Sequence, residues 1–259
     1  MKKTIISCVL FLTAVTAFSQ TPMKTAAEAK LSASDLAVKI ADRILATTTY
    51  EFKNTKTGKT YKSVKNLPLD MNVKVACKYN NWHYTNGVTH IALMELADKT
   101  GAKKYDDYVL KNMNFVFNEG NLDFFKKQYE QAMKNEGWYG VRKLSWHMIF
   151  RGKRLDDNGP MGASLIDLQM KHPNNSFLNY INETAEHLNY GEPRLADGTI
   201  ARIWPHENTI WADDAFMAIS FLARMAKMTG DMSYINDAAN QVIKYHKYLW
   251  CPEKRILYH

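Results

Sequence analysis

The sequence predicts an all-α domain built from repeated helix–turn–helix hairpins, and two aligned segments carry this prediction. Segments 82–105 and 211–234 align without a gap, and both contain a tryptophan at the start, a Thr-Gly pair and a closing tyrosine. Apolar residues in each recur at three- and four-residue intervals before the Thr-Gly pair, as they do on the buried face of a helix. Strand signals are weak, and the best is the short segment 139–150.

Single residues mark where the helices start and stop. Ser34 and Asp35 are typical of a helix start, so an amphipathic helix is expected after them. The two aligned segments should turn at Gly101 and Gly230, because only glycine takes the left-handed conformation of a helix end without steric cost. The lysine-rich segment 53–65 is expected to be a solvated loop or an exposed face.

A third hairpin is expected between the two aligned segments. Residues 161–170 have a helical pattern, the stretch 172–175 contains a proline and breaks it, and a new pattern begins at Phe177. Hairpins that cannot bury an apolar face alone must stack, and a closed ring of six makes a toroid with a central cleft. About four hairpins fit this chain, so we expect an incomplete (α/α) six-hairpin toroid over residues 20–259, with the C-terminal part missing.

The N-terminus predicts export. Lys2 and Lys3 precede an apolar run over 5–18, and small residues follow at 17–19. This three-part pattern is typical of a secretory signal peptide, here residues 1–19, whose apolar stretch is too short to span a bilayer. We therefore expect a periplasmic or secreted protein with no later membrane span.

Composition excludes several classes of protein. An apolar content of 46% argues against a disordered chain. The formal charge of +8 suits an acidic substrate, but no arginine-rich stripe or zinc-finger spacing indicates nucleic acid. Histidines are dispersed, so neither a metal site nor a cofactor is expected. Cys77 and Cys251 could pair in an oxidising compartment, although two buried thiols are the preferred interpretation.

Two acidic doublets are the candidate chemistry. Asp156-Asp157 and Asp213-Asp214 each precede an apolar helix. Carboxylates at such positions often cap a helix or complement its dipole, which is the structural alternative to a functional role. Adjacent helical residues point about 100° apart, so one aspartate can cap while the other faces a cleft. Trp211, two residues before Asp213, offers an aromatic wall of the kind that stacks on sugars.

The motifs around these doublets resemble a known family. Arg-Leu-Asp-Asp-x-Gly-x-Met-Gly-Ala stands at 154–163, Pro-x-x-Asn-Thr-Ile-Trp-x-Asp-Asp-x-Phe-Met at 205–217, and Leu-Tyr-His at 257–259. Together they resemble glycoside hydrolase family 105, the unsaturated rhamnogalacturonyl hydrolases, which are related to the unsaturated glucuronyl hydrolases of family 88. The resemblance runs from about residue 82 to the last residue.

The resemblance implies a fold, a reaction and a set of site residues. It implies a six-hairpin toroid that removes a terminal 4,5-unsaturated galacturonic acid from a small rhamnose-containing oligosaccharide. The family's general acid falls on Asp213 and its second important carboxylate on Asp156. Its sugar-contacting tryptophan falls on Trp211, and a histidine near the reacting centre falls on His259. An aromatic wall from the first hairpin falls near Trp82 and Tyr84, and Arg202 is expected to bind the uronate.

The implied chemistry is hydration of an enol ether and needs no cofactor. Asp213 would protonate the double bond, and Asp156 would orient or activate water. In the family, the chain continues past Leu-Tyr-His with further sugar contacts, which this sequence does not contain. Two alternatives therefore stay open: a conventional or family-88-like glycosidase, and a catalytically defective or truncated toroid that binds glycans.

Overall fold

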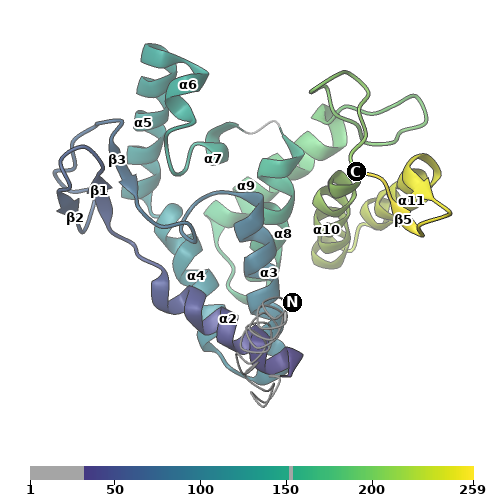
Figure 1. Ribbon diagram of the computed structural model, residues 1–259, viewed down its shortest axis with the longest axis horizontal. Coiled ribbons are helices and arrows are strands. Elements are labelled where there is room, and N and C mark those ends of the chain that lie inside the picture. The colour runs from purple at the N-terminus through teal and green to yellow at the C-terminus, as the bar shows by residue number, and fades with distance from the viewer. Residues whose placement is uncertain (1–31, 152–153) are drawn as a thin grey trace, which may run out of the picture. The chain divides into compact units, whose positions relative to one another are not determined.

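The computed structural model describes residues 32–151 and 154–259 and is mostly helical (Figure 1). The chain divides into two units, Met1–Ile40 and Ala41–His259. The expected signal peptide, residues 1–19, lies outside the described residues.

The helices are α2 (Ala33–Thr47), α3 (Tyr84–Thr100), α4 (Lys104–Val116), α5 (Glu119–Glu136), α6 (Trp138–Val141), α7 (Met148–Arg151), α8 (Leu155–Lys171), α9 (Asn175–Glu186), α10 (Ala212–Thr229) and α11 (Met232–Leu249), with a π-helical turn, η1, over His187–Gly191.

Three helical hairpins, α3–α4, α8–α9 and α10–α11, form the framework of the described residues. The first and last contain the two aligned segments. Gly101 and Gly230 end their first helices in the left-handed conformation, at φ 71° and 76°, and donate their backbone N–H groups to the carbonyls of Ala97 and Ala226. The predicted hairpins and their glycine turns are therefore confirmed, and the all-α fold class with them.

Helix α8 packs between α3 and α10 (Figure 1). Glycines allow the backbones to touch: a Cβ added to Gly87 of α3 would lie 2.4 Å from the Pro160 carbonyl carbon, and one added to Gly159 would lie 2.3 Å from the Met217 carbonyl oxygen. These contacts join the second turns of the three helices. The N-terminal ends of α3, α8 and α10 therefore lie at the same end of the framework.

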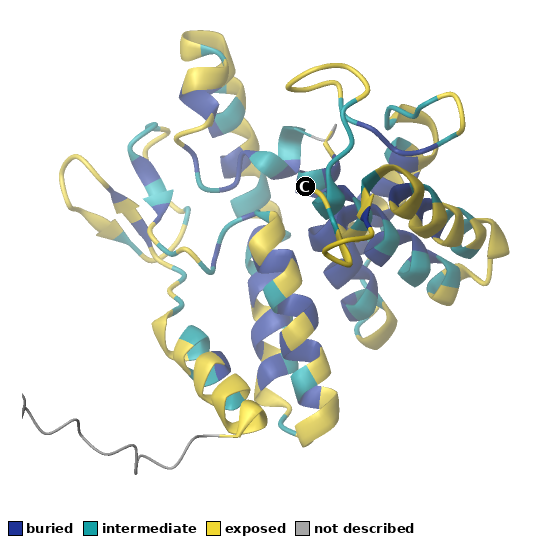
Figure 2. Ribbon diagram, turned by 45° about the vertical axis from the view of Figure 1, so that its right-hand side comes forward, coloured by how far each residue is buried: buried dark blue, intermediate teal, exposed yellow. Residues whose placement is uncertain are grey.

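Buried apolar side chains fill the space between these helices. Figure 2 shows the buried residues along the facing sides of the helices and the exposed ones on the outer surfaces and loops. The fully buried side chains include Met161, Leu165, Ile166, Leu168, Phe177, Ile181, Phe221 and Leu222, all from the hairpins α8–α9 and α10–α11. Each helix contributes one apolar face to this core, which is the arrangement that the three- and four-residue spacing predicts.

Two expectations about local structure are wrong. Segment 139–150 forms no strand but α6, turns and α7. Its buried residues from position 141 on are irregularly spaced, which does not match the alternation of a strand; they are Val141, Leu144, Trp146, His147 and Ile149. Helix α8 begins at Leu155 rather than near residue 161, because Arg154 is its N-cap and the polar first turn hides the apolar pattern.

The described strands are short. β1 (Phe52–Asn54), β2 (Thr60–Tyr61) and β3 (Val73–Val75) form an antiparallel sheet in the order β2-β1-β3, so part of the lysine-rich segment is paired and not a free loop. β4 (Trp250–Cys251) pairs with β5 (Ile256–Leu257). Cys77 is half-buried and Cys251 is buried, and both are free thiols. No described helix has the length and apolar character needed to cross a membrane.

Candidate active site

The two acidic doublets lie in the first turns of α8 and α10, at the shared end of the framework. Within each doublet the second residue is buried, with Asp157 and Asp214 each 1% exposed. The first residue faces outward, and the side chains of Asp156 and Asp213 keep 24% and 36% of their surface exposed. The two residues of each doublet therefore differ in exposure, as the helical rotation predicts, but neither doublet caps its helix, because Arg154 and Trp211 occupy the cap positions and no side-chain cap bond forms.

Arg202 is the centre of the site. Its Nε and Nη2 atoms donate to the two carboxylate oxygens of Asp214, each at 2.6 Å. Nη1 and Nη2 donate to Asp156 at 3.1 and 2.7 Å, and Nη2 lies 3.8 Å from the carboxylate of Asp213. A guanidinium has five N–H donors, so these four hydrogen bonds use most of its capacity. Arg202 thereby ties the first turns of α8 and α10 together.

One guanidinium serves three carboxylates, so negative charge is in excess. Burial raises the pKa of Asp214 to about 6, the hydrogen bonds from Arg202 oppose this shift, and the charges of Asp156 and Asp213 support it. Burial acts to lower the pKa of Arg202, but the hydrogen bonds to Asp214 and Asp156 outweigh it and raise that pKa. Arg202 is consequently a fixed positive charge, and Asp214 takes up a proton at a higher pH than an exposed aspartate does.

The buried aspartate of the α8 doublet, Asp157, is held by a different arginine. Arg151 forms a hydrogen bond and an ion pair with Asp157, and its guanidinium lies 5.0 Å from the ring centre of Trp138. Burial raises the pKa of Asp157 to about 6, and Arg151 opposes that shift. Both inner aspartates are thus held by an arginine, and Asp156 is held by Arg202 as well. Asp213 differs from these three, because it lies 3.8 Å from Arg202 and accepts no hydrogen bond from it.

Asp213 has the surroundings expected of a reacting group. Trp211, the N-cap residue of α10, lies against the guanidinium of Arg202 at 4.1 Å and beside the ring of His259 at 5.2 Å. The Nε2 atom of His259 lies 3.5 Å from Oδ1 of Asp213. Among the described residues, nothing donates a hydrogen bond to that oxygen. The helix-cap alternative does not hold for this residue, since Trp211 occupies the cap position and no side-chain cap bond is formed.

Five of the seven predicted site residues are brought together by these contacts: Asp156, Arg202, Trp211, Asp213 and His259. The expected role of Arg202 as the uronate ligand has little support, because Asp156 and Asp214 already take four of its N–H donors. Arg202 is better described as a positioning residue.

The aromatic wall expected from the first hairpin is not formed by Trp82. Its side chain is fully buried against Phe117, Trp146 and Tyr180, and its Nε1 donates to the Asp157 carbonyl at 2.9 Å. A ring with no exposed face cannot stack on a sugar, so this expectation is corrected. Tyr84 is 37% exposed at the start of α3, and its ring packs on that of His83.

Sequence reasoning missed His83. This residue is the N-cap of α3, and its side chain accepts a hydrogen bond from the Thr85 backbone. Burial lowers the pKa of His83, whereas the negative charge of Asp156 opposes the shift. His83 therefore lies within the electrostatic reach of the site. The repeat alignment gives no signal for it, because the matching position in the second segment is Ala212.

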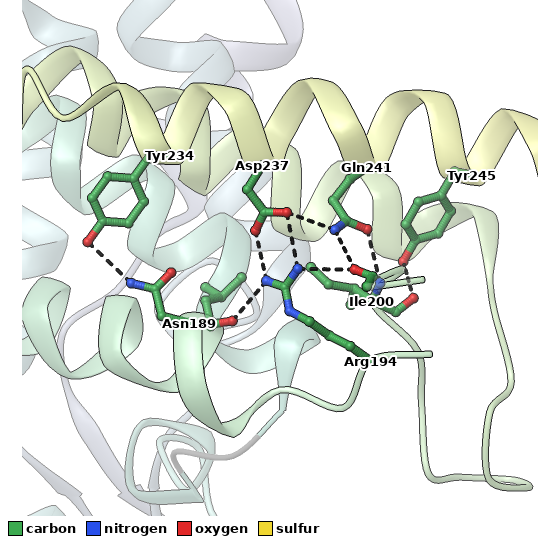
Figure 3. A network of polar contacts seen from close by, with 9 residues as sticks. Asn189, Arg194, Ile200, Tyr234, Asp237, Gln241 and Tyr245 are labelled. Carbon is green, nitrogen blue, oxygen red and sulfur yellow. Dashed lines mark hydrogen bonds and ion pairs between the residues drawn. The ribbon is translucent and has the colours of Figure 1, made fainter. Parts of the chain in front are cut away.

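The loop that carries Arg202 is anchored on α11 (Figure 3). Arg194 makes a two-point ion pair with Asp237 at 3.1 and 2.8 Å. Gln241 accepts from the Ile200 backbone N–H at 3.0 Å, and Tyr245 donates to the Ile200 carbonyl at 3.1 Å. These bonds fix the backbone two residues before Arg202, and an outer helix thereby positions the centre of the site.

Solved structures with a similar fold come from three bacteria. A possible member of the GH105 family from Salmonella enterica subsp. enterica serovar Paratyphi A matches with a TM-score of 0.54 and 14% identity, over 92% of this chain and 54% of that chain. A family 105 glycoside hydrolase from C. acetobutylicum matches with a TM-score of 0.55 and 21% identity, over 88% of this chain and 49% of that chain. A possible member of the GH105 family from Klebsiella pneumoniae subsp. pneumoniae matches with a TM-score of 0.53 and 13% identity, over 92% of this chain and 54% of that chain.

These similarities establish the fold as that of a helical toroid. This chain spans about half the length of each of the three solved structures. The comparison with curated protein sequences gave no significant match. The family model described as Glycosyl Hydrolase Family 88 matches residues 55–259, a range that includes both acidic doublets and the whole cluster around Arg202. The chain therefore belongs to glycosyl hydrolase family 88.

Proposed function

We propose that the site removes a terminal 4,5-unsaturated uronic acid, of the galacturonyl type, from rhamnogalacturonan-type oligosaccharides. The observation that carries this proposal is the setting of Asp213. Its side chain is partly exposed, its buried oxygen Oδ1 accepts no hydrogen bond from a described residue, and Trp211 and His259 flank it. A group in this position is available to transfer a proton to a bound ligand.

The proposed reaction is hydration of the double bond. Protonated Asp213 gives its proton to carbon 4, and the electron pair of the double bond forms the new C–H bond. Positive charge then develops at carbon 5 and is shared with the ring oxygen. A water molecule adds to carbon 5 and loses a proton, which gives a hemiketal. The hemiketal opens as the bond between carbon 5 and the ring oxygen breaks, which gives a ketone at carbon 5 and a hemiacetal at carbon 1. The hemiacetal collapses to an aldehyde, and the glycosidic bond breaks as the neighbouring sugar leaves with a proton.

Asp156 is assigned the second role because of its contacts. Both of its carboxylate oxygens accept hydrogen bonds from Arg202, which hold the carboxylate in one orientation. A fixed negative charge suits the stabilisation of the cation that develops in the ring and the orientation of the attacking water. Asp213 accepts no hydrogen bond from Arg202, so its carboxyl is the one assigned to proton transfer.

The test is turnover of an unsaturated rhamnogalacturonan disaccharide, followed by loss of the ultraviolet absorbance of the double bond. Asp213→Asn should lower turnover by about 10²–10⁴-fold, the usual contribution of a positioned general acid. Asp231→Asn is the matched control, because Asp231 caps α11 and asparagine caps equally well. Turnover of Asp213→Asn within about tenfold of the parent would remove Asp213 from this role.

The same assay separates the alternatives. A conventional glycosidase would cleave a saturated oligosaccharide with no loss of absorbance, and a glycan-binding toroid would bind without turning over either substrate. We also propose that the protein acts outside the cytoplasm, since residues 1–19 have the pattern of a signal peptide. N-terminal sequencing of the exported protein would test that proposal, and a start near residue 20 is expected.

A further inference from the structure

A run of lysines lies outside the proposed active site. Within segment 53–65 every third residue is a lysine, and the segment contains no acidic residue. These lysines supply most of the formal net charge of +8 of the whole chain. Positive charge is therefore concentrated in one short segment. We call this set the lysine surface, and it consists of Lys53, Lys56, Lys59, Lys62 and Lys65.

The lysine surface is carried by β1, β2 and the turns beside them, and all five of its residues are exposed. In β1, Phe52 and Asn54 are buried, whereas Lys53 between them points to solvent. The register of the sheet sets Lys53 opposite Lys74 of β3, and side chains directly opposite each other stand on the same face. Like charges in that arrangement repel each other, and a bound anion would relieve the repulsion.

The positive charge of the lysine surface is not neutralised by the protein. Among the residues that the structure describes, no carboxylate forms an ion pair with it, whereas Lys103 and Lys127 each pair with an aspartate one helical turn away. The nearest acidic influence is Asp70. Hydrogen bonds from Asn72 lower the pKa of Asp70, and the charge of Lys56 makes a smaller contribution in the same direction. An anionic ligand could therefore pair with these lysines without displacing an existing partner.

The backbone beneath the lysine surface is held in a fixed shape. The buried side chain of Asn54 accepts hydrogen bonds from two backbone N–H groups of the β1–β2 turn, each at 3.0 Å, and donates to Asp70 at 2.8 Å. Gln128 of α5, also buried, donates to the carbonyls of Asp70 and Val73 at 2.7 and 2.8 Å. The turn is thus tied to β3 and through it to α5. A surface held in this way has little backbone freedom to lose when it binds a ligand.

We propose that the lysine surface binds an acidic polysaccharide, a polyuronate chain longer than the oligosaccharide that the active site would cleave. The inference rests on the proposed function, because the choice of a uronate polymer follows from an enzyme that acts on uronate sugars. Each sugar of a polyuronate carries one carboxylate, so one chain can pair with several lysines at once. Exposed ion pairs are weak singly, but linked charges bind together at a high effective concentration.

The composition of the lysine surface favours carboxylates over the phosphates of a nucleic acid. All of its cations are lysines, which act as point charges, and none is an arginine, whose planar group binds phosphate through two hydrogen bonds. Proteins that bind single-stranded nucleic acids also offer aromatic rings to the bases. The one aromatic ring within the segment, Tyr61, is half-buried, and the Lys59 ammonium lies 5.1 Å from its centre. Charge pairing is the interaction that remains.

Binding of polygalacturonate to the full chain, measured by titration calorimetry, tests the inference. The affinity should be highest at an ionic strength of about 0.01 M and should fall at about 0.15 M, because the Debye length shortens from about 30 Å to about 8 Å. Fully methyl-esterified polygalacturonate is the ligand control. Its sugars are the same, but its carboxylates are blocked, so it should not bind.

A triple substitution tests the position of the binding surface. Lys53→Gln/Lys56→Gln/Lys62→Gln should weaken the binding of polygalacturonate about tenfold, since each exposed ion pair contributes little alone and three are lost. The matched control replaces three exposed lysines elsewhere: Lys99→Gln/Lys227→Gln/Lys254→Gln. Both variants lose the same net charge, so a difference between them isolates the place of the charge from its amount. The control variant should bind as the parent does.

Three results would overturn the inference: no binding of polygalacturonate at the lower ionic strength, equal weakening by the two triple substitutions, or tighter binding of single-stranded DNA or of phosphatidylglycerol vesicles. Turnover of the unsaturated disaccharide should be the same in both variants and the parent, because none of these lysines contacts Asp213 or Arg202. The two proposals can therefore fail separately. Lysine-dependent binding without turnover would reject the proposed function alone, and turnover without such binding would reject the lysine surface alone.

Discussion

Arg202 holds both carboxylate oxygens of Asp214, at 2.6 Å from Nε and 2.6 Å from Nη2. The aspartate is 1% exposed, and the arginine side chain is 14% exposed. This buried ion pair lies beneath the more exposed carboxylates of Asp156 and Asp213. Both the local stability of the site and the spacing of its outer groups therefore depend on the pair.

Removal of the arginine alone should be costly. Arg202→Met leaves Asp214 buried without its partner, and we expect the free energy of unfolding to fall by about 3–5 kcal/mol. The double variant Arg202→Met/Asp214→Leu removes the uncompensated charge as well and should recover most of that loss. Urea unfolding of the parent, the single variant and the double variant measures both values. Equal stability of the two variants would show that the pair is not the source of the loss.

The helical framework could be predicted because its signals are local. The apolar spacing and the positive-φ glycines at 101 and 230 act within a few residues of themselves, and the structure keeps both turns. The acidic doublets were expected just ahead of their helices, whereas the structure places them in the first turns of α8 and α10, because polar residues can begin a helix before its apolar pattern starts.

The environment of each tryptophan could not be predicted in this way. Trp82 and Trp211 occupy equivalent positions in the aligned segments, yet the first is fully buried and the second is only partly covered. Phe117 and Tyr180 cover Trp82, and they lie 35 and 98 residues away along the chain. The hydrogen bonds from Arg202 to Asp156 likewise join residues that lie 46 positions apart in the sequence. Contacts between distant segments leave no periodic signal in the sequence.

The contact between α8 and α10 should not tolerate a methyl group. A Cβ at Gly159 would lie 2.3 Å from the Met217 carbonyl oxygen, which belongs to the backbone of the neighbouring helix and cannot move aside. Gly159→Ala should therefore lower the free energy of unfolding by about 3 kcal/mol or more. Gly120→Ala in α5 is the control, because its nearest neighbour is the flexible Val64 side chain at 3.3 Å. That variant should stay within about 1 kcal/mol of the parent in the same unfolding experiment.

His90 should make the protein sensitive to acid. It is 2% exposed, no described residue forms a hydrogen bond with its ring nitrogens, and burial lowers the pKa of His90 from 6.5 to about 4. Between these two values the unfolded chain binds a proton that the folded protein does not. The free energy of unfolding should consequently fall as the pH falls through this window, by up to about 3 kcal/mol.

Chemical unfolding at several pH values between 4 and 7 measures the contribution of His90. His90→Leu should flatten the dependence on pH in this window, because the titrating group is gone. His206→Gln removes an exposed histidine and should leave the slope unchanged. If the two variants had the same slope as the parent, the acid sensitivity would have to come from other groups.

The anchoring of the Arg202 loop on α11 leads to a prediction about local motion. Gln241 is fully buried, accepts from the Ile200 N–H at 3.0 Å and donates to the Gly198 carbonyl at 3.0 Å. Gln241→Met keeps the size of the side chain but leaves the Ile200 N–H without a partner, while the Gly198 carbonyl still accepts from Arg194. The loss should cost about 1–3 kcal/mol. Amide hydrogen exchange of the peptide containing Ile200 should rise, because the loop can then open without global unfolding.

Asn240→Met is the control for that substitution, since the neighbouring Asn240 side chain is exposed and should leave exchange unchanged. If the loop positions Arg202 as the structure indicates, Gln241→Met should also lower turnover of the unsaturated disaccharide, while Asn240→Met should not. Unchanged exchange at Ile200 in the Gln241 variant would mean that the hydrogen bonds of Gln241 do not hold the loop. The anchoring would then belong to the other contacts of the loop, namely the Arg194–Asp237 ion pair, the Tyr245 hydrogen bond and the ion pairs of Arg202.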